Sequence, residues 1–373
     1  MNMSTNNITV VGEPGEGGSL SRVFSLSKSI IESLEVSIEY CNFYFDFQSG
    51  GVVFEVDRDD VSSALKRPGF LFLNIHLMPE LEKLIGLEQL EQMKLTPVWV
   101  WEMPSVPAEW LRYLRIPERI IVPSQFVGDC FRSSGFEGQI SVIPHNLDPV
   151  FSCDGKMIRD PKDGCTYGFS FSFVSGLARK NVLGLVEAYK LAFPRSSKSV
   201  RLVLKSEHGN FRPDDAHLLW RHIGERDDIT LISRSLSVLE YSCWLKSLDT
   251  FVSLHRSEGF GLCIAEAMMC GVATISTGYS GNLEFQNPNN SSLVSFEMSD
   301  VGNSRTNNDP FLPGMMWAEP CINHAADLIL QDADCSISRQ SRADKGQYDA
   351  KFQLSIDRLM KLWFSEISLF DNK

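Results

Sequence analysis

The chain has 373 residues, of which 43% are hydrophobic and 22% are charged, and this is enough apolar sequence for two domains with separate cores. The formal net charge is −12, and the first 150 residues hold 11 Lys and Arg against 20 Asp and Glu. This acidic balance disfavours nucleic-acid binding and a broad basic face for membranes. No apolar run approaches the roughly 20 residues that cross a bilayer.

Nine cysteines are scattered along the chain without a C-x-x-C pair or zinc-ligand spacing. They indicate reduced thiols, which are typical of a cytoplasmic protein. The opening residues MNMSTNNITVV lack the basic and apolar regions of a signal peptide. We therefore expect a cytoplasmic protein, which could also make weak peripheral contact with the cytoplasmic face of the membrane.

The first half opens with a strand at residues 8–11, a glycine-rich segment at residues 12–18 and a helix at residues 19–34. A strand, a glycine-rich loop and a helix make a corner whose free backbone N–H groups can bind an anion. The segment is neither a G-x-G-x-x-G fingerprint nor a P-loop, and a flexible turn is the alternative.

The rest of the first half alternates short apolar runs with helical patterns, which predicts a mostly parallel sheet. Residues 36–47 and 51–56 are β-rich but ambiguous. Strands are expected at residues 70–75, 97–101, 119–122 and 140–143, and helices at residues 57–66, 79–92, 107–114 and 125–134.

The second half repeats this alternation after a polar linker, residues 154–166. We expect an N-terminal Rossmann-like domain at residues 1–150 and a C-terminal one at residues 166–350. An amphipathic helix at residues 352–367 is predicted to pack back on the first domain. Within the second domain, strands are expected at residues 169–174, 200–205, 229–232, 250–255 and 272–276, and helices at residues 182–193, 217–224, 239–247, 262–270, 322–331 and 338–345.

Residues 254–285, LHRSEGFGLCIAEAMMCGVATISTGYSGNLEF, are the most informative stretch. They predict a loop, a helix, a strand and a second loop, as in a βαβ unit. Free N–H groups at residues 259–262 and the helix dipole suit a diphosphate. Glu258 and Glu266 would repel phosphate, so we expect them to accept hydrogen bonds from hydroxyls, as a nucleotide sugar offers. The alternative is a capping Glu258 and an exposed Glu266.

Arg179 and Lys180 follow one predicted strand and precede a helix. Two cations there suit a diphosphate leaving group. A solvated charge pair is the alternative, but helix N-termini disfavour cations, so their placement needs a reason.

The run S-E-G-F-G-L, then A-E-A, a small-residue turn, a strand and a G-x-x-G loop resembles the signature of retaining GT-B glycosyltransferases of the family 4 type, the glycosyl transferases group 1. The resemblance implies that Glu258 contacts the donor sugar and Glu266 the ribose, and that Arg179 and Lys180 of R-K-N hold the diphosphate. It also implies that the backbone amides of the loop before the helix contact the donor. The residues of this loop are Gly259, Phe260, Gly261 and Leu262.

In the first half the resemblance is patchier. Gly17, Gly18 and Arg22 resemble G-x-G-x-x-x-R, which implies donor contacts for the glycines and an acceptor-side place for the arginine. His76 ends an apolar strand, where family members hold a catalytic-site histidine, although a lone histidine is more often structural. Glu102 in V-W-V-W-E-M-P resembles bacterial enzymes of surface glycans, where acceptor orientation is its expected role. W-A-E-P at residues 317–320 resembles the same subset, and we expect it to be a packing segment.

We therefore predict an α/β protein with a GT-B fold, in which two Rossmann-like domains with mostly parallel sheets face each other across a cleft. The resemblance implies retaining transfer of a sugar from a nucleotide diphosphate sugar to a glycan or lipid-linked glycan hydroxyl in surface polysaccharide synthesis. Neither a metal nor another cofactor is expected, because no D-x-D motif ends a predicted strand. The alternatives are a nucleotide-sugar-binding GT-B protein without transferase activity, or a GT-B epimerase or phosphorylase.

Overall fold

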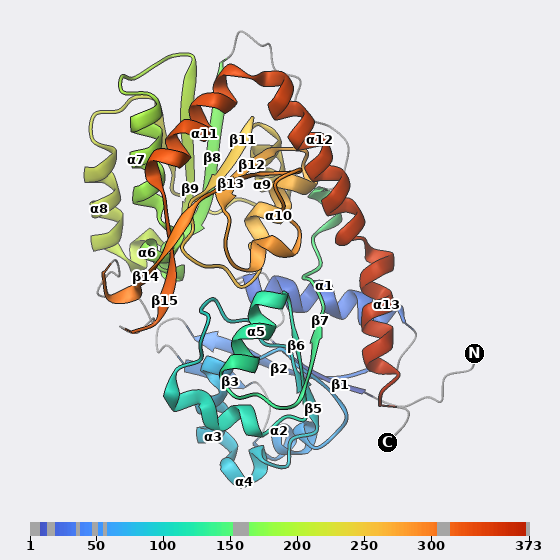
Figure 1. Cartoon of the computed structure of the whole chain (residues 1–373). Coiled ribbons are helices and arrows are strands. Elements are labelled where there is room, and N and C mark those ends of the chain that lie inside the picture. The colour runs from blue at the N-terminus through green and yellow to red at the C-terminus, as the bar shows by residue number, and fades with distance from the viewer. Residues whose placement is uncertain are drawn as a thin grey trace. The chain divides into compact units, whose positions relative to one another are not determined.

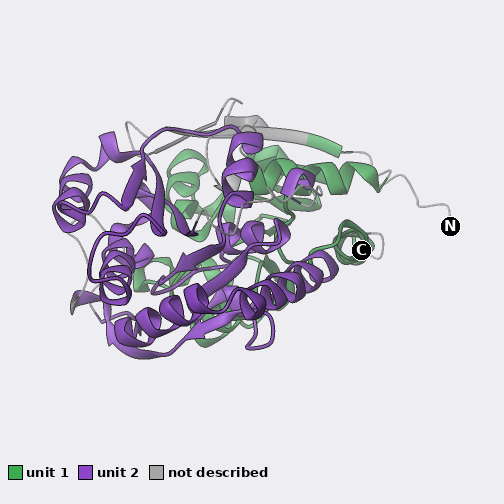
Figure 2. Cartoon of the chain, turned by 90° about the horizontal axis from the view of Figure 1, so that it is seen from above, with its two compact units in different colours: residues 1–147, 354–373 green, residues 148–353 purple. Residues whose placement is uncertain are grey.

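Two sheets of mostly parallel strands organise the chain, each in its own compact unit (Figures 1 and 2). Unit 1 is Met1–Leu147 with Leu354–Lys373, and unit 2 is Asp148–Gln353. The computed structural model describes residues 8–12, 19–34, 38–46, 51–54, 58–151, 164–303 and 314–370. Within these ranges no helix is long and apolar enough to cross a membrane.

Unit 1 contains a five-stranded sheet in the order β3-β2-β1-β4-β5. Its strands run parallel except for the pair β2 and β3, which accounts for the ambiguous β-rich segments of the sequence. A parallel pair, β6 and β7, is joined to this sheet by a bridge between Val98 and Ile121. The strands are β1 (Ile8–Gly12), β2 (Ile38–Asp46), β3 (Gly51–Phe54), β4 (Gly69–Leu71), β5 (Leu95–Pro97), β6 (Arg119–Val122) and β7 (Gln139–Val142).

Helices alternate with these strands, as the sequence predicts. The expected helix at residues 79–92 is divided in two, because Gly86 between its halves has φ of 86°. The expected strand at residues 97–101 ends early and gives way to irregular chain. The helical elements are α1 (Ser19–Ser33), α2 (Arg58–Leu65), η1 (Ile75–Leu77), α3 (Met78–Ile85), α4 (Leu87–Leu90), η2 (Ala108–Arg115), which is a 3-10 helix, and α5 (Gln125–Ser133).

The core of unit 1 includes a helix from the far end of the chain, α13 (Ile356–Ile367). Its face with Leu359 and Trp363 is buried among residues of β1, α1 and β4. The Trp363 ring meets the Phe70 ring edge to face, with 5.0 Å between their centroids. Apolar burial of this kind is the main stabilising contribution to a core, so α13 is an integral part of unit 1.

Unit 2 is built on six parallel strands in the order β10-β9-β8-β11-β12-β13. From β8 the chain adds strands toward one edge of the sheet, and from β11 it adds them toward the other edge. The strand order therefore reverses between the neighbours β8 and β11, and we call this place the switch point. The strands are β8 (Cys165–Ser172), β9 (Val200–Glu207), β10 (Ile229–Ile232), β11 (Thr250–Ser253), β12 (Ala273–Thr277) and β13 (Ser292–Val294).

The helices of unit 2 connect these strands, and α7 packs against α11 while α10 packs against α12 (Figure 1). An antiparallel pair, β14 (Phe296–Asp300) and β15 (Met316–Pro320), lies outside the main sheet. The helices are α6 (Leu177–Lys180), α7 (Val182–Ala192), α8 (Pro213–Ile223), α9 (Val238–Lys246), α10 (Leu262–Met269), α11 (Ile322–Asp334) and α12 (Ser336–Gln353). The prediction of two Rossmann-like α/β domains with mostly parallel sheets is confirmed.

Candidate functional site

The predicted donor-site residues of unit 2 meet at the switch point, where the strand order reverses between β8 and β11. The strands β8 and β11 pair in parallel, with Thr250 opposite Tyr167. Arg179 and Lys180 follow β8, and Glu258 follows β11. Because both strands end at the same edge, the two loops converge there, and open α/β sheets bind their ligands at such a switch point.

Two hydrogen bonds, one from the backbone and one from a side chain, join these two loops. The Arg256 N–H donates to the Arg179 carbonyl at 2.8 Å. The Arg179 Nη1 donates to the Ser257 carbonyl at 2.9 Å. Arg179, which follows β8, is thus bonded to both Arg256 and Ser257, which follow β11. These bonds fix the spacing between the charged side chains of the two loops.

Glu258 lies between the two cations. Its Oε1 is 2.5 Å from Lys180 Nζ and its Oε2 is 3.2 Å from Arg179 Nη1. Burial by itself would raise the pKa of this carboxyl, but the charges of Lys180 and Arg179 outweigh it and lower the pKa to about 2. The site is therefore a buried cluster of two positive charges and one negative charge. Arg179 and Lys180 are not the solvated charge pair that was the alternative prediction.

The start of α10 is shaped by glycines. Gly261 has φ of 89°, a conformation that favours glycine, and it immediately precedes the helix. A Cβ on Gly281 would lie 2.1 Å from the Gly259 carbonyl, so only glycine permits this approach of two loops. The Gly281 N–H donates to the Glu258 carbonyl at 2.9 Å. The Phe260 side chain is buried against Phe285, so this residue could contact a ligand only through its backbone.

Glu266 lies on α10 with only 1% of its surface exposed. This excludes the alternative that it is an ordinary exposed helix residue. Its carboxylate therefore lies inside the protein, beside the glycine-bounded start of the helix.

Arg256 is a site residue that the sequence analysis missed. Its guanidinium makes a bidentate ion pair with Glu319, with Nε and Nη2 at 2.7 and 2.8 Å from the two carboxylate oxygens. It lies 5.3 Å from the centroid of the Trp317 ring, and its Nη1 donates to the Ala178 carbonyl at 2.5 Å. The W-A-E-P segment is therefore strand β15 and holds the arginine that joins the two loops. The R-S-E-G-F-G sequence placed Arg256 beside the motif, but nothing in it signalled a partner 63 residues away.

His255 was also missed. It is fully buried, and its Nε2 lies 3.0 Å from Asn282 Oδ1 and 3.1 Å from the Tyr279 carbonyl. Both are acceptors, because the Asn282 Nδ2 donates elsewhere, so we place the imidazole proton on Nε2. Burial lowers the pKa of His255, although Glu258 acts against this. The neutral ring supports the loop that carries Glu258.

The predicted residues of unit 1 lie on separate elements. His76 lies on η1 and is exposed. The protein that surrounds its imidazole lowers its pKa, and the charge of Glu102 acts against this. Arg22 lies on α1, and its charge adds to burial in lowering the pKa of His145 to about 3. The two predicted glycines, at positions 17 and 18, fall outside the described residues.

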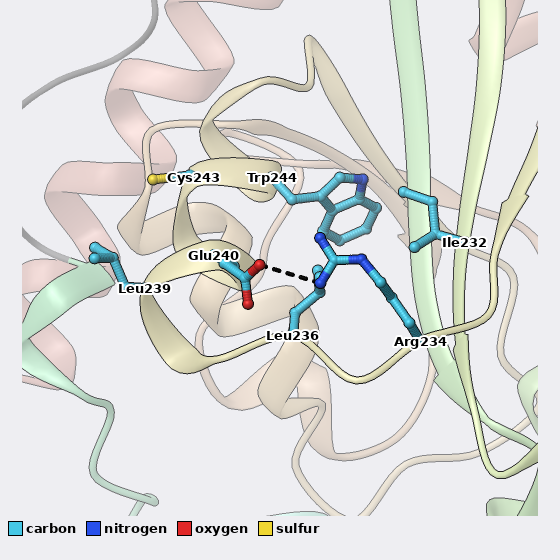
Figure 3. A pocket seen from close by; sticks show the side chains of 7 residues that line it. All are labelled: Ile232, Arg234, Leu236, Leu239, Glu240, Cys243 and Trp244. Atoms are coloured by element: carbon cyan, nitrogen blue, oxygen red, sulfur yellow. Dashed lines mark hydrogen bonds and ion pairs between the residues drawn. The ribbon is translucent and has the colours of Figure 1, made fainter.

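A separate pocket opens at the end of β10 and the start of α9 (Figure 3). In the close-up, the Arg234 guanidinium pairs with the Glu240 carboxylate at 3.1 Å. Apart from this pair its walls are mainly apolar, and none of them belongs to the predicted site. The lining residues are Ile232, Arg234, Leu236, Leu239, Glu240, Cys243 and Trp244.

Metal ligands do not cluster in the part of the chain that the structure describes: it holds no group of three His, Cys, Asp or Glu that could bind a metal ion. The expected independence of metals remains a prediction.

The strand order and the charged cluster beside it define an α/β protein with a candidate ligand site at the carboxyl edge of the sheet in unit 2. Comparison with known proteins narrows this class. Residues 168–300, just over a third of the chain and all within unit 2, match the family model described as glycosyl transferases group 1. A search of curated proteins finds no match.

Among solved structures, sucrose-phosphate synthase from Thermosynechococcus elongatus is similar with a TM-score of 0.69 and 14% identity, over 99% of this chain and 100% of its own. HepE from Anabaena in complex with UDP and glucose has a TM-score of 0.67 and 14% identity, over 97% of this chain and 99% of its own. TarM from S. aureus, in complex with UDP among other ligands, has a TM-score of 0.60 and 13% identity, over 91% and 66%. At this identity the likeness establishes the fold, so the predicted GT-B fold is confirmed.

Proposed function

We propose that this protein is a retaining glycosyltransferase of the family 4 type that takes a nucleotide diphosphate sugar as its donor. The observation that carries the proposal is the buried cluster of Arg179, Lys180 and Glu258 at the switch point of unit 2. Two cations beside a glycine-bounded helix start form a site for a diphosphate. The family match over residues 168–300 includes all three residues.

In the proposed reaction the bond between the anomeric carbon and the diphosphate oxygen breaks. A new bond forms to an acceptor hydroxyl, which loses its proton, and the nucleoside diphosphate leaves with the negative charge. Arg179 and Lys180 would stabilise that charge as it develops, which is the electrostatic contribution that most lowers a barrier of this kind. Glu258 would hold the donor sugar, and Glu266 the ribose.

The pocket at β10 and α9 supports a place for the nucleobase. The strand β10 is separated from β8 by β9 alone, and all three strands run parallel, so their ends share one edge. Neighbouring strands lie about 4.8 Å apart, so the two strand ends are roughly 10 Å apart. This matches the reach from a diphosphate across a ribose to a base, and the apolar walls with Trp244 suit the flat face of that base.

Glu102 and Arg22 of unit 1 would lie on the acceptor side, and His76 would belong to the catalytic site. We further propose that the acceptor is a hydroxyl on a glycan or lipid-linked glycan and that the reaction serves surface polysaccharide synthesis. The enzyme would act in the cytoplasm and without a metal. A nucleotide-sugar-binding protein without transferase activity, or an epimerase or phosphorylase, is the alternative.

The test is a donor panel of UDP-, GDP-, ADP- and dTDP-hexoses, offered with glycan acceptors and analysed by mass spectrometry. We expect one donor to give a glycosylated product whose anomeric signal in NMR retains the donor configuration. The Lys180→Ala variant should lose this activity, whereas Lys198→Ala, which removes an exposed lysine of the same unit, should keep it. Release of free sugar alone, whatever the acceptor, would favour the alternative, and inversion would refute retention.

A further inference from the structure

We propose that Trp110 of unit 1, together with His76 and Glu102, forms a platform that binds one pyranose ring of a carbohydrate acceptor. The apolar C–H face of the sugar would stack on the Trp110 indole, and its hydroxyls would bond to the two polar side chains. This inference rests on the proposed function, because it names where the acceptor of that reaction binds.

The platform lies at the carboxyl edge of the sheet in unit 1. The strands β4 and β5 are parallel neighbours, and His76 follows the first while Glu102 and Trp110 follow the second. The loops after them are joined directly, because the Val100 N–H donates to Asn74 Oδ1 at 2.8 Å. This is the edge at which parallel sheets bind ligands.

Aromatic contacts set the orientation of Trp110. Its ring is half-buried and meets the buried Trp101 ring in a T-shaped arrangement, with 5.0 Å between centroids and 80° between planes. Trp101 is itself fixed, since its Nε1 donates to the Ser105 carbonyl at 2.8 Å. The centroid of the exposed His76 ring lies 6.1 Å from that of Trp110. Trp110 is thus held by two aromatic neighbours and keeps accessible surface, on which the apolar face of a sugar could stack.

The helix that carries Trp110 is anchored on its other side. Tyr113 is completely buried, and its hydroxyl donates to Glu82 Oε2 at 2.5 Å. Arg112 pairs with the same carboxylate at 2.7 Å. With η2 pinned to α3 in this way, Trp110 can remain in place without a ligand, and binding costs little ordering entropy.

Polar groups of two kinds complete the platform. Glu102 is half-buried and close enough to His76 for its charge to influence the imidazole. A carboxylate accepts two hydroxyl hydrogen bonds, and an imidazole can donate one and accept another. A sugar site needs an aromatic surface with a small number of polar groups beside it. The aromatic surface supplies affinity, and the polar groups determine the orientation of the sugar.

The first experiment observes Trp110 directly and does not depend on turnover. The full chain is labelled with 5-fluorotryptophan, and its ¹⁹F resonances are assigned with Trp110→Phe and Trp220→Phe. Methyl glycosides of the common hexoses are then titrated. We expect at least one to shift the Trp110 resonance saturably and to leave that of Trp220, an equally suitable reporter at 53% exposure in unit 2, unchanged. A Trp110 resonance that no glycoside moves would overturn the platform.

The second experiment is kinetic. Trp110→Leu should raise the acceptor KM about 10- to 50-fold, from the loss of one indole face, with the donor KM unchanged. Glu102→Gln should raise it as well, whereas the control Trp220→Leu should not. Circular dichroism and the retained affinity for UDP would show that Trp110→Leu is folded. An unchanged acceptor KM in that variant would refute the inference.

The two proposals fail in different ways. If UDP and the other nucleoside diphosphates do not bind, the proposed function is wrong, whatever Trp110 does. If they bind and transfer occurs, but Trp110 responds to no sugar, only the platform is wrong. A sugar response without nucleotide binding would support the platform and refute the transferase.

Discussion

Replacing Glu258 by Gln should destabilise the ligand-free protein strongly. The amide keeps the shape of the side chain but leaves Arg179, which is 3% exposed, and Lys180 without their shared carboxylate. Removing one partner from a buried ion pair costs about 3–5 kcal/mol. The pKa gives a similar figure, since lowering it from 4.5 to about 2 corresponds to roughly 3 kcal/mol of folding free energy.

The pH dependence of this loss is specific. Because the folded protein has the lower pKa, Glu258 contributes its full stability above pH 4.5 and loses it as the pH falls toward about 2. The difference in unfolding free energy between wild type and Glu258→Gln should therefore be largest near pH 7 and shrink between about pH 5 and 2. His145, whose pKa is lowered to about 3, also destabilises the fold on acidification, but it does so in both proteins and cancels in the difference.

Urea denaturation followed by circular dichroism would measure this difference, with Glu187→Gln, an exposed glutamate on α7, as the control. A nucleoside diphosphate should bind Glu258→Gln at least as tightly as wild type, because the two cations no longer share their charge with a carboxylate. Wild-type stability of Glu258→Gln at pH 7, or a stability difference that does not change with pH, would refute the reasoning.

Further outcomes follow from the same site. Lys180→Ala should lower kcat by roughly 10²–10³, measured with the full donor, and should also lower the midpoint of thermal unfolding, because Glu258 keeps only Arg179 as its partner; near-normal turnover would end its assignment. Glu266→Gln should weaken binding of the nucleoside diphosphate alone by roughly 10- to 150-fold in calorimetry, as for a lost charged hydrogen bond; unchanged affinity would exclude the ribose contact. Glu319→Gln should lower kcat through Arg256, and the exchange Arg256→Glu with Glu319→Arg should recover part of it, which a purely local role would not predict. Activity should survive excess EDTA, and loss that Mn²⁺ or Mg²⁺ restores would reveal a metal site.

Much of unit 2 could be predicted because its motif is local. A β-rich run, a glycine-bounded loop and a helix occur together in residues 254–285, and all form as expected. What the sequence could not reveal is that Glu258 pairs with Arg179 and Lys180. Lys180 lies 78 residues before Glu258, and Arg179 lies 78 residues before Ser257, the other residue it contacts. That pairing depends on β8 lying next to β11, and strand order is a property of the folded sheet.

Unit 1 was harder to predict because local signals there compete. The apolar run through Trp101 indicates a strand, yet the chain turns so that the Trp101 indole reaches the Ser105 carbonyl. Gly86 interrupts a helix that periodicity alone would continue. The aromatic arrangement around Trp110 likewise depends on where two loops end, which a pattern of residues does not encode.

The position of α13 has a consequence for how the chain is made. The ribosome completes the first 147 residues of unit 1 well before α13, because all of Asp148–Gln353 comes between them. At roughly 5–20 residues per second, those two hundred residues take on the order of 10–40 s to synthesise. During that interval the apolar surface around Phe70, which Trp363 covers in the finished protein, lacks its partner. The nascent first unit therefore exposes this surface until α13 is made, whereas unit 2 is continuous in the sequence and has all its residues once Gln353 is added.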